Sequence, residues 1–201
     1  RVVPTPQPEA GQQLLHACGA PGGKSFSTAI AMGDNGSILS CDIHPGKVKQ
    51  IAKGAKRLGL TSIQSQVRNA KEHDPALDGQ FDLVLADAPC SGLGIIRKKP
   101  DIRNKEPEPL KDLPRIQGDI LENVSRYVKS GGVLVYSTCT VLERENQDVV
   151  QGFLARHPEF ALEPFPLPGA IGTVEEGMLT LWPHIHGTDG FFLSKMRKQG
   201  T

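Results

Sequence analysis

Short apolar, β-branched runs that alternate with helix-length segments are the feature of this sequence that most restricts its fold. Such runs occupy residues 13–17, 37–41, 63–67, 81–87, 133–138 and 190–196. Apolar residues with helical spacing occupy 25–32, 47–58, 116–128 and 145–156. Strands alternating with helices of this length indicate a parallel sheet covered on both faces. We therefore predict an α/β fold with a doubly wound, mostly parallel sheet.

Length and composition favour one domain over residues 1–201, because a chain of 201 residues that is 38% hydrophobic can bury one core. No apolar run reaches the roughly 20 residues that cross a bilayer, so we expect a soluble, cytoplasmic protein with no membrane partner. The formal net charge of +1 gives no general attraction to nucleic acid. Any affinity for RNA must therefore be local.

Three segments interrupt the alternating pattern. The Pro-rich lead at 1–11 carries no element of its own and is expected to mark a domain boundary. Residues 97–115 combine basic residues, acidic residues and prolines, which predicts an ordered, non-helical surface loop. Residues 164–188 are rich in Pro and Gly and are expected to wrap the surface.

A Gly-rich turn, HACGAPGGKS, follows the first predicted strand. Two consecutive glycines permit close backbone approach to a ligand at a helix N-terminus, although the spacing matches neither a P-loop nor Gly-x-Gly-x-x-Gly. Asp42 ends the second strand, where an acid can accept hydrogen bonds from both ribose hydroxyls of a nucleoside. The alternatives are a purely structural turn and a helix-capping role for Asp42.

The sequence contains four cysteines, and two of them directly follow strands, in DAPCSG and STCT. Ligands of open parallel sheets bind beyond the carboxyl ends of the strands, so Cys90 and Cys139 should face one crevice. A thiolate there is suited to nucleophilic addition. The alternative is that free cysteines only fill space in the core, and we accept this interpretation for Cys18 and Cys41.

Taken together, ACGAPGGKS, DAPCSGLG with its RKKPDIR tail, YSTCTVLERENQ and TDGFF resemble the Sun (Nol/Nop) family of RNA 5-methylcytosine methyltransferases. The resemblance covers nearly the whole chain, with four motifs in matching order and spacing. It implies a Rossmann-like, seven-stranded class I methyltransferase domain that uses S-adenosylmethionine. It also implies an RNA substrate, with ribosomal RNA expected before transfer RNA.

The resemblance assigns Cys139 as the nucleophile, Cys90 to the elimination that frees the product, and Asp87 to a hydrogen bond with the cytosine ring. It gives cofactor contacts to ten residues: Cys18, Gly19, Ala20, Pro21, Gly22, Gly23, Lys24, Asp42, Asn69 and Asp87.

Three positions depart from the family pattern. His16 stands where the family usually has Asp, Gly19 where it usually has Ala, and Asn69 where an acid commonly contacts the adenine side. We interpret His16 as a packed strand-end histidine. His184 and His186 lack a third ligand, so we expect them to be structural and expect no metal.

RNA contacts are expected from Arg97, Lys98, Lys99 and Arg103, which could neutralise phosphates beside the crevice. A solvated charged loop is the alternative. The resemblance implies N-terminal RNA-binding parts in family members, and we expect residues 1–201 to be the catalytic domain without them. The alternative functions are a transfer RNA cytosine-5 methyltransferase, a non-catalytic RNA-binding scaffold on the same fold, and a nicotinamide-linked dehydrogenase.

Overall fold

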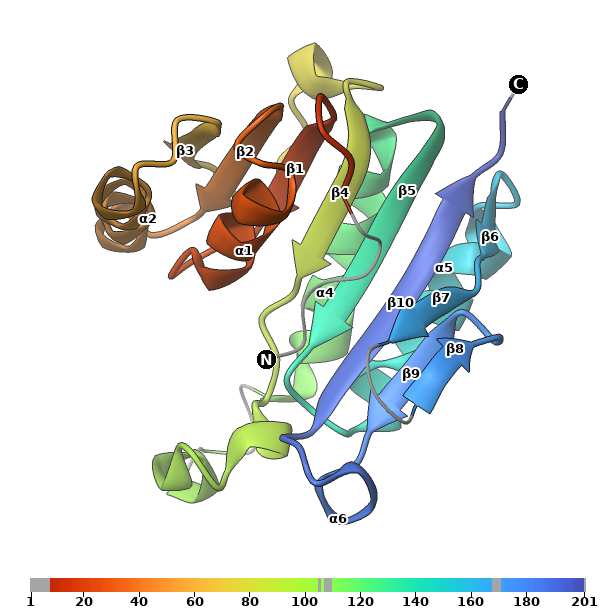
Figure 1. Ribbon diagram of the computed structural model, residues 1–201. Helices are drawn as coiled ribbons and strands as arrows, with labels where there is room; N and C mark the ends of the chain where they lie inside the picture. Colours follow the sequence, from red (N-terminus) through yellow and green to blue (C-terminus); the bar gives the residue numbers. More distant parts are fainter. Residues whose placement is uncertain (1–7, 105, 107–109, 168–170, 201) are drawn as a thin grey trace.

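The computed structural model describes residues 8–104, 106, 110–167 and 171–200. Its centre is a sheet whose strands lie side by side in the order β3 (Ile63–Val67), β2 (Ser37–Asp42), β1 (Gln13–Ala17), β4 (Phe81–Asp87), β5 (Val128–Thr138) and β10 (Phe191–Lys198) (Figure 1). From β3 to β5 all neighbours are parallel, whereas β10 is antiparallel to β5. The predicted mostly parallel sheet is confirmed.

Two short strands share the seventh position of the sheet. β6 (Phe160–Leu162) pairs with one end of β10, and β9 (Met178–Leu181) pairs with its other end. A hairpin of β7 (Phe165–Leu167) and β8 (Gly172–Val174) forms a separate small sheet.

The segment 164–188 is therefore not the irregular wrap that we predicted. It contains β7, β8, β9 and the short helix α6 (Pro183–His186). Each of these elements is only three or four residues long, and β9 is ordered by pairing with β10. A local pattern of Pro and Gly does not reveal such distant partners.

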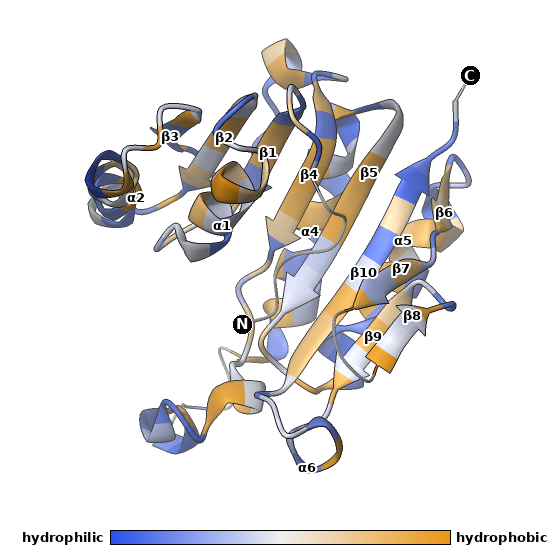
Figure 2. Cartoon of the chain, viewed as in Figure 1, coloured by the Kyte–Doolittle hydropathy of each residue, from blue (hydrophilic) through white to orange (hydrophobic). Residues whose placement is uncertain are grey.

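Helices cover the sheet on both faces. Leu83, Leu85, Val133 and Val135 pack with residues of α1 (Gly23–Ala31) on one face. Val84, Ala86, Leu134 and Tyr136 pack on the other face with α4 (Leu113–Val124) and α5 (Gln147–Arg156). These alternating positions show why β4 from Leu83 to Ala86 and β5 from Val133 to Tyr136 are largely apolar, since both faces of these stretches are buried. Figure 2 shows hydrophobic residues in both strands. α2 (Pro45–Leu58) packs beside β2 and β3.

Two predicted boundaries shift. The helix expected at 116–128 begins at Leu113 and ends at Val124, and Val128 already belongs to β5. Pro114 stands in its first turn, where proline suits a helix. The predicted loop at 97–115 therefore contains the start of α4, and also a 3-10 helix at Pro100–Asn104. The glycine turn at 130–132 interrupts the register between β4 and β5.

None of the helices in the described ranges is both long enough and apolar enough to cross a bilayer. The carboxyl ends of β1, β4 and β5 meet at the lower edge of the sheet in Figure 1. This edge is where the predicted site residues gather.

Candidate active site

A pocket of about 390 Å³ opens at the carboxyl edge of the sheet. Eight of the predicted site residues line it: Cys18, Ala20, Lys24, Asp42, Asn69, Asp87, Cys90 and Cys139. Gly19, Pro21 and Gly23 line an adjoining larger cavity instead, and Gly22 is buried at the N-terminus of α1. Lys24 and Asp87 line both cavities and so stand between them.

The two predicted catalytic sulfurs converge. Cys90 Sγ and Cys139 Sγ lie 3.1 Å apart, and the Cys139 N–H donates to Cys90 Sγ at 3.2 Å. The hydrogen bond from the Cys90 thiol lowers the pKa of Cys139, while the same bond and burial raise the pKa of Cys90. The pair therefore favours a Cys139 thiolate facing a Cys90 thiol.

A second polar cluster lies beside the sulfurs. The register of β4 and β5 sets Asp87 opposite Ser137, and Ser137 Oγ donates to Asp87 Oδ1 at 2.8 Å. Lys24 forms an ion pair with Asp87 and donates to Ser137 Oγ at 3.0 Å. The Lys24 ammonium lowers the pKa of Cys139, and the Asp87 carboxylate raises it, both less than the hydrogen bond from Cys90 does. A charged lysine and a carboxylate thus face the pocket next to the nucleophile candidate.

Three of the sequence motifs meet in a backbone clamp. The Gly94 N–H donates to the Cys139 carbonyl at 3.0 Å, and the Gly190 N–H donates to the Gly94 carbonyl at 2.8 Å. A Cβ atom on Gly94 would overlap the backbone of Gly190, so only glycine permits this approach. Ser91 Oγ also donates to Thr140 Oγ1 at 2.8 Å. The cysteine loops are therefore fixed to each other and to the start of β10.

The wall on the β2 side suits a nucleoside. Asp42 ends β2, is buried, and lines the pocket beside Cys18 and Ile43, whose side chain is 52% exposed. Asp42 Oδ1 accepts the His44 N–H at 3.0 Å, so one carboxylate oxygen holds the turn before α2. A carboxylate beside an apolar side chain can accept from ribose hydroxyls while the base packs against carbon. The residues present fit such a ligand.

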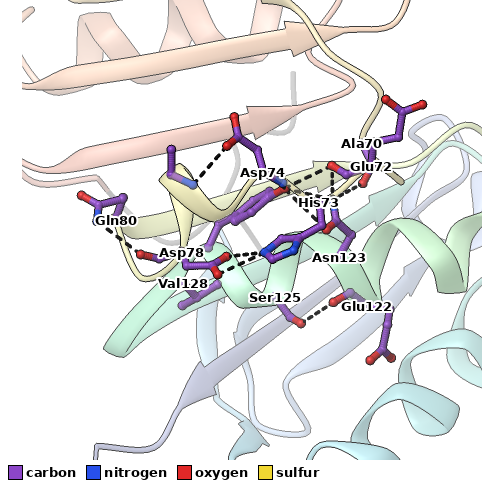
Figure 3. Close-up of polar contacts among 12 residues, drawn as sticks. Ala70, Glu72, His73, Asp74, Asp78, Gln80, Glu122, Asn123, Ser125 and Val128 are labelled. Atoms are coloured by element: carbon purple, nitrogen blue, oxygen red, sulfur yellow. Dashed lines mark hydrogen bonds and ion pairs between the residues drawn. The ribbon is translucent and has the colours of Figure 1, made fainter.

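Asn69 lines the pocket, but its side chain bonds within its own loop. Asn69 Nδ2 donates to Glu72 Oε1 at 2.8 Å, and Asn69 Oδ1 accepts the Lys71 N–H at 3.2 Å. This loop is fixed to the end of α4 (Figure 3). Asn123 Nδ2 donates to the carbonyls of Ala70 at 2.8 Å and Glu72 at 3.0 Å. Asn69 therefore shapes the wall through the loop, and its contact with adenine stays a prediction.

The predicted RNA-binding cluster is partly neutralised. Arg97 and Lys98 both form ion pairs with Asp189, whose side chain is buried, and both line the larger cavity. Lys99 and Arg103 are exposed nearby. Contact of any of these four residues with phosphate stays a prediction.

The two histidines of α6 show no site. His186 Nδ1 accepts the Trp182 N–H at 2.9 Å, and His184 is exposed. Within the described ranges, no group of three or more His, Cys, Asp or Glu residues could hold a metal ion.

The sequence analysis gave no role to three residues that organise the site: Gln117, Ser137 and Glu145. Ser137 can be found from strand register, because it is the neighbour of Asp87 across β4 and β5. Gln117 and Glu145 are fully buried polar residues in helical segments. No local pattern distinguishes them from ordinary helix residues.

Comparison with known proteins gives consistent matches over almost the whole chain. The family model for 16S rRNA methyltransferase RsmB/F matches residues 4–197. The chain is 44% identical over 200 residues to the probable ribosomal RNA small subunit methyltransferase B of Bacillus subtilis. It is 36% identical over 199 residues to the ribosomal RNA small subunit methyltransferase F of Klebsiella pneumoniae.

These matches cover 96% of this chain in both cases, but only 44% of the Bacillus protein and 41% of the Klebsiella protein. The chain thus spans less than half the length of the curated relatives that it matches. Among solved structures, NSun6 from Pyrococcus horikoshii, crystallised with SFG, matches with a TM-score of 0.79 and 26% identity. That match covers 96% of this chain and 50% of NSun6.

These findings confirm the predicted Rossmann-like, S-adenosylmethionine-dependent methyltransferase fold, and they exclude the dehydrogenase alternative. The family model spans far more than half of the sequence and includes all four motifs on which the predicted resemblance rested. The chain belongs to the 16S rRNA methyltransferase RsmB/F family.

Proposed function

We propose that this chain transfers a methyl group from S-adenosylmethionine to carbon 5 of a cytosine in small-subunit ribosomal RNA. The observation that carries the proposal is the pair of sulfurs 3.1 Å apart at a pocket that Lys24 and Asp87 also line. The names of the Bacillus and Klebsiella relatives support ribosomal RNA over transfer RNA as the substrate.

Cys139 acts first. Carbon 5 of cytosine is too electron-poor to attack a methyl group, so the Cys139 thiolate forms a bond to carbon 6, and the electron pair of the double bond between carbons 5 and 6 is displaced and makes carbon 5 nucleophilic. Asp87 hydrogen-bonds and orients the ring, with Lys24 and Ser137 holding its carboxylate in place, and the Lys24 ammonium offsets the negative charge that develops on the ring. The Gly-rich turn and Asp42 would hold S-adenosylmethionine, which would supply the electrophilic methyl group.

Cys90 acts second. Once Cys139 is bonded to carbon 6, its backbone N–H still faces Cys90 Sγ and stabilises a thiolate at Cys90, whose proton leaves to solvent. The Cys90 thiolate then takes the proton from carbon 5. The electrons of that C–H bond restore the double bond between carbons 5 and 6, and the Cys139 sulfur leaves as a thiolate.

The test uses the complete protein, S-adenosylmethionine and small-subunit ribosomal RNA. We expect Cys139→Ala to reduce methyl transfer by about a thousandfold or more, because the variant lacks the thiolate that adds to carbon 6. We expect Cys90→Ala to add to RNA and remain attached, which is measured as a covalent complex stable in denaturing gels. Cys41→Ala is the matched control, since Cys41 lies outside the pocket lining.

Mapping of 5-methylcytosine in the product RNA identifies the substrate. Undiminished methylation by either Cys139→Ala or Cys90→Ala would contradict the role given to that thiol. Methylation of transfer RNA in place of ribosomal RNA would leave the chemistry intact and overturn the substrate. Failure to bind S-adenosylmethionine at all would favour a non-catalytic scaffold.

A further inference from the structure

Glu145 is a fully buried carboxylate close to the cysteine loops and outside the pocket lining. It ends the 3-10 helix Glu143–Glu145, just before α5. Its side chain is 0% exposed. Its backbone carbonyl accepts the Tyr136 hydroxyl at 2.7 Å, which fixes the residue to the buried face of β5. The position of the carboxylate is therefore set by the core.

The carboxylate holds the chain on both sides of Cys90. Glu145 Oε2 accepts the Ser91 N–H at 2.9 Å and Gln117 Nε2 at 3.0 Å. Gln117 Nε2 also donates to the Pro89 carbonyl at 2.9 Å. Pro89 and Ser91 are the two sequence neighbours of Cys90, so its backbone is attached at both ends to a Glu145–Gln117 pair.

Burial of the Glu145 carboxylate is energetically unfavourable, and an apolar residue at this position would avoid that unfavourable burial. Burying a carboxylate is expensive even when hydrogen bonds compensate it. Within the described residues, Glu145 Oε1 and Gln117 Oε1 have no hydrogen-bond partner, and burying an unsatisfied oxygen is unfavourable. An apolar side chain of similar size would fill the space without this cost. The two hydrogen bonds of the Glu145 carboxylate beside Cys90 therefore point to a role in placing this loop.

We propose that Glu145 is a positioning residue that, with Gln117, places the Cys90 sulfur for the elimination step. The inference rests on the proposed function, and it names what fixes the geometry of that step. Without the acceptor at Glu145, the Ser91 N–H loses this hydrogen bond and the loop that carries Cys90 is no longer held at this point. Misplacement of a reacting group by about 1 Å can cost a hundredfold in rate.

The discriminating variants are Glu145→Leu, Glu145→Gln and Glu143→Leu. Glu145→Leu removes the acceptor and keeps similar volume. Glu145→Gln keeps an amide oxygen that can accept the same two hydrogen bonds, so it should restore function. Glu143→Leu is the matched control, because Glu143 is exposed in the same 3-10 helix.

The experiment measures three quantities for the complete protein with small-subunit ribosomal RNA: turnover, S-adenosylmethionine affinity and the fraction of RNA held covalently. We expect Glu145→Leu to lower turnover by about a hundredfold, with unchanged cofactor affinity. We also expect it to accumulate the covalent complex as Cys90→Ala does. Glu145→Gln and Glu143→Leu should behave like the parent protein.

A merely structural role would lower stability without trapping RNA, so a folded Glu145→Leu that accumulates no covalent complex overturns the inference. If Glu145→Leu does not fold, Gln117→Leu tests the inference in its place. This variant removes the donor to the Pro89 carbonyl and leaves the hydrogen bond between the Ser91 N–H and Glu145. A folded Gln117→Leu variant that accumulates no covalent RNA complex would also contradict the inference. If Cys90→Ala also forms no complex, the proposed function itself fails.

Discussion

His16 and Gly19, two positions at which the resemblance led us to expect other residues, are in direct contact. A Cβ atom at position 19 would lie 2.5 Å from Ser40 Oγ and 3.2 Å from the His16 ring. His16 Nδ1 is hydrogen-bonded to Ser25 Oγ at 2.7 Å, and Ser25 Oγ to Ser40 Oγ at 2.9 Å. The imidazole and the Ser40 hydroxyl thus occupy the space of the missing methyl group, which agrees with the interpretation of His16 as a packed histidine.

The burial of His16 predicts loss of stability in mild acid. Desolvation lowers its pKa from 6.5 to about 4. Below pH 6.5 the unfolded chain binds a proton that the folded protein does not bind until about pH 4. The free energy of unfolding should therefore fall by about 1.4 kcal/mol per pH unit across this window, about 3 kcal/mol in total.

Urea unfolding of the parent protein and of His16→Gln between pH 7 and pH 4 checks this prediction. The variant has no group that titrates at position 16, so its acid loss should be smaller by about that amount. His157 has a raised pKa and opposes the trend, but it is common to both proteins. If the free energy of unfolding falls equally with pH in the parent protein and in His16→Gln, the predicted role of His16 is wrong.

At the scale of elements, the sequence predicts which loops meet but not how closely. Cys90 and Cys139 could be placed at one edge because they directly follow β4 and β5, and parallel strands share their carboxyl edge. The separation of the sulfurs depends on Gly94, Gly190 and Glu145, which come from other segments. The four short strands β6 to β9 were missed for the same reason, since pairing outside the local sequence defines them.

The contact of Gly94 with Gly190 yields a test of the clamp. Gly94→Ala would place a methyl group against the Gly190 backbone and push apart the loops that carry Cys139 and Cys90. We expect a loss of about 1–3 kcal/mol in stability and a larger relative loss in methyl transfer.

Gly118→Ala is the control for this change. Gly118 lies within α4, where an added Cβ meets nothing within 4 Å, so alanine should be neutral or stabilise by about 0.5–1 kcal/mol. The measurements are thermal unfolding and methyl transfer for both variants. If Gly94→Ala and Gly118→Ala have the same thermal stability and the same methyl-transfer activity, the clamp does not constrain the site.

At the scale of the whole molecule, the mostly parallel sheet and the edge that holds the site were predictable, because alternating strands and helices admit few topologies. The pairing of surface charges was harder to predict from the sequence. Arg97 and Lys98 looked like free cations in the sequence, yet both pair with Asp189 from the other end of the chain. Lys99 and Arg103 are therefore the better candidates for contact with RNA phosphates.

Replacing both residues, as Lys99→Ala with Arg103→Ala, should weaken RNA binding mainly at low salt. Each lost phosphate contact reduces the slope of log affinity against log salt by about 0.7–0.9. Titration of the complete protein with small-subunit ribosomal RNA at several salt concentrations measures this slope. Lys49→Ala with Lys53→Ala, on the exposed side of α2, is the matched control. Equal slopes for the two double variants would remove the cluster from the RNA interface.

The central claim, covalent addition by Cys139, is tested most directly by mass spectrometry of Cys90→Ala after incubation with small-subunit ribosomal RNA and S-adenosylmethionine. After digestion with nuclease and protease, the account predicts a methylated cytidine nucleotide attached to the peptide that contains Cys139. An unmodified Cys139 peptide, in a variant that still methylates the RNA, would contradict it.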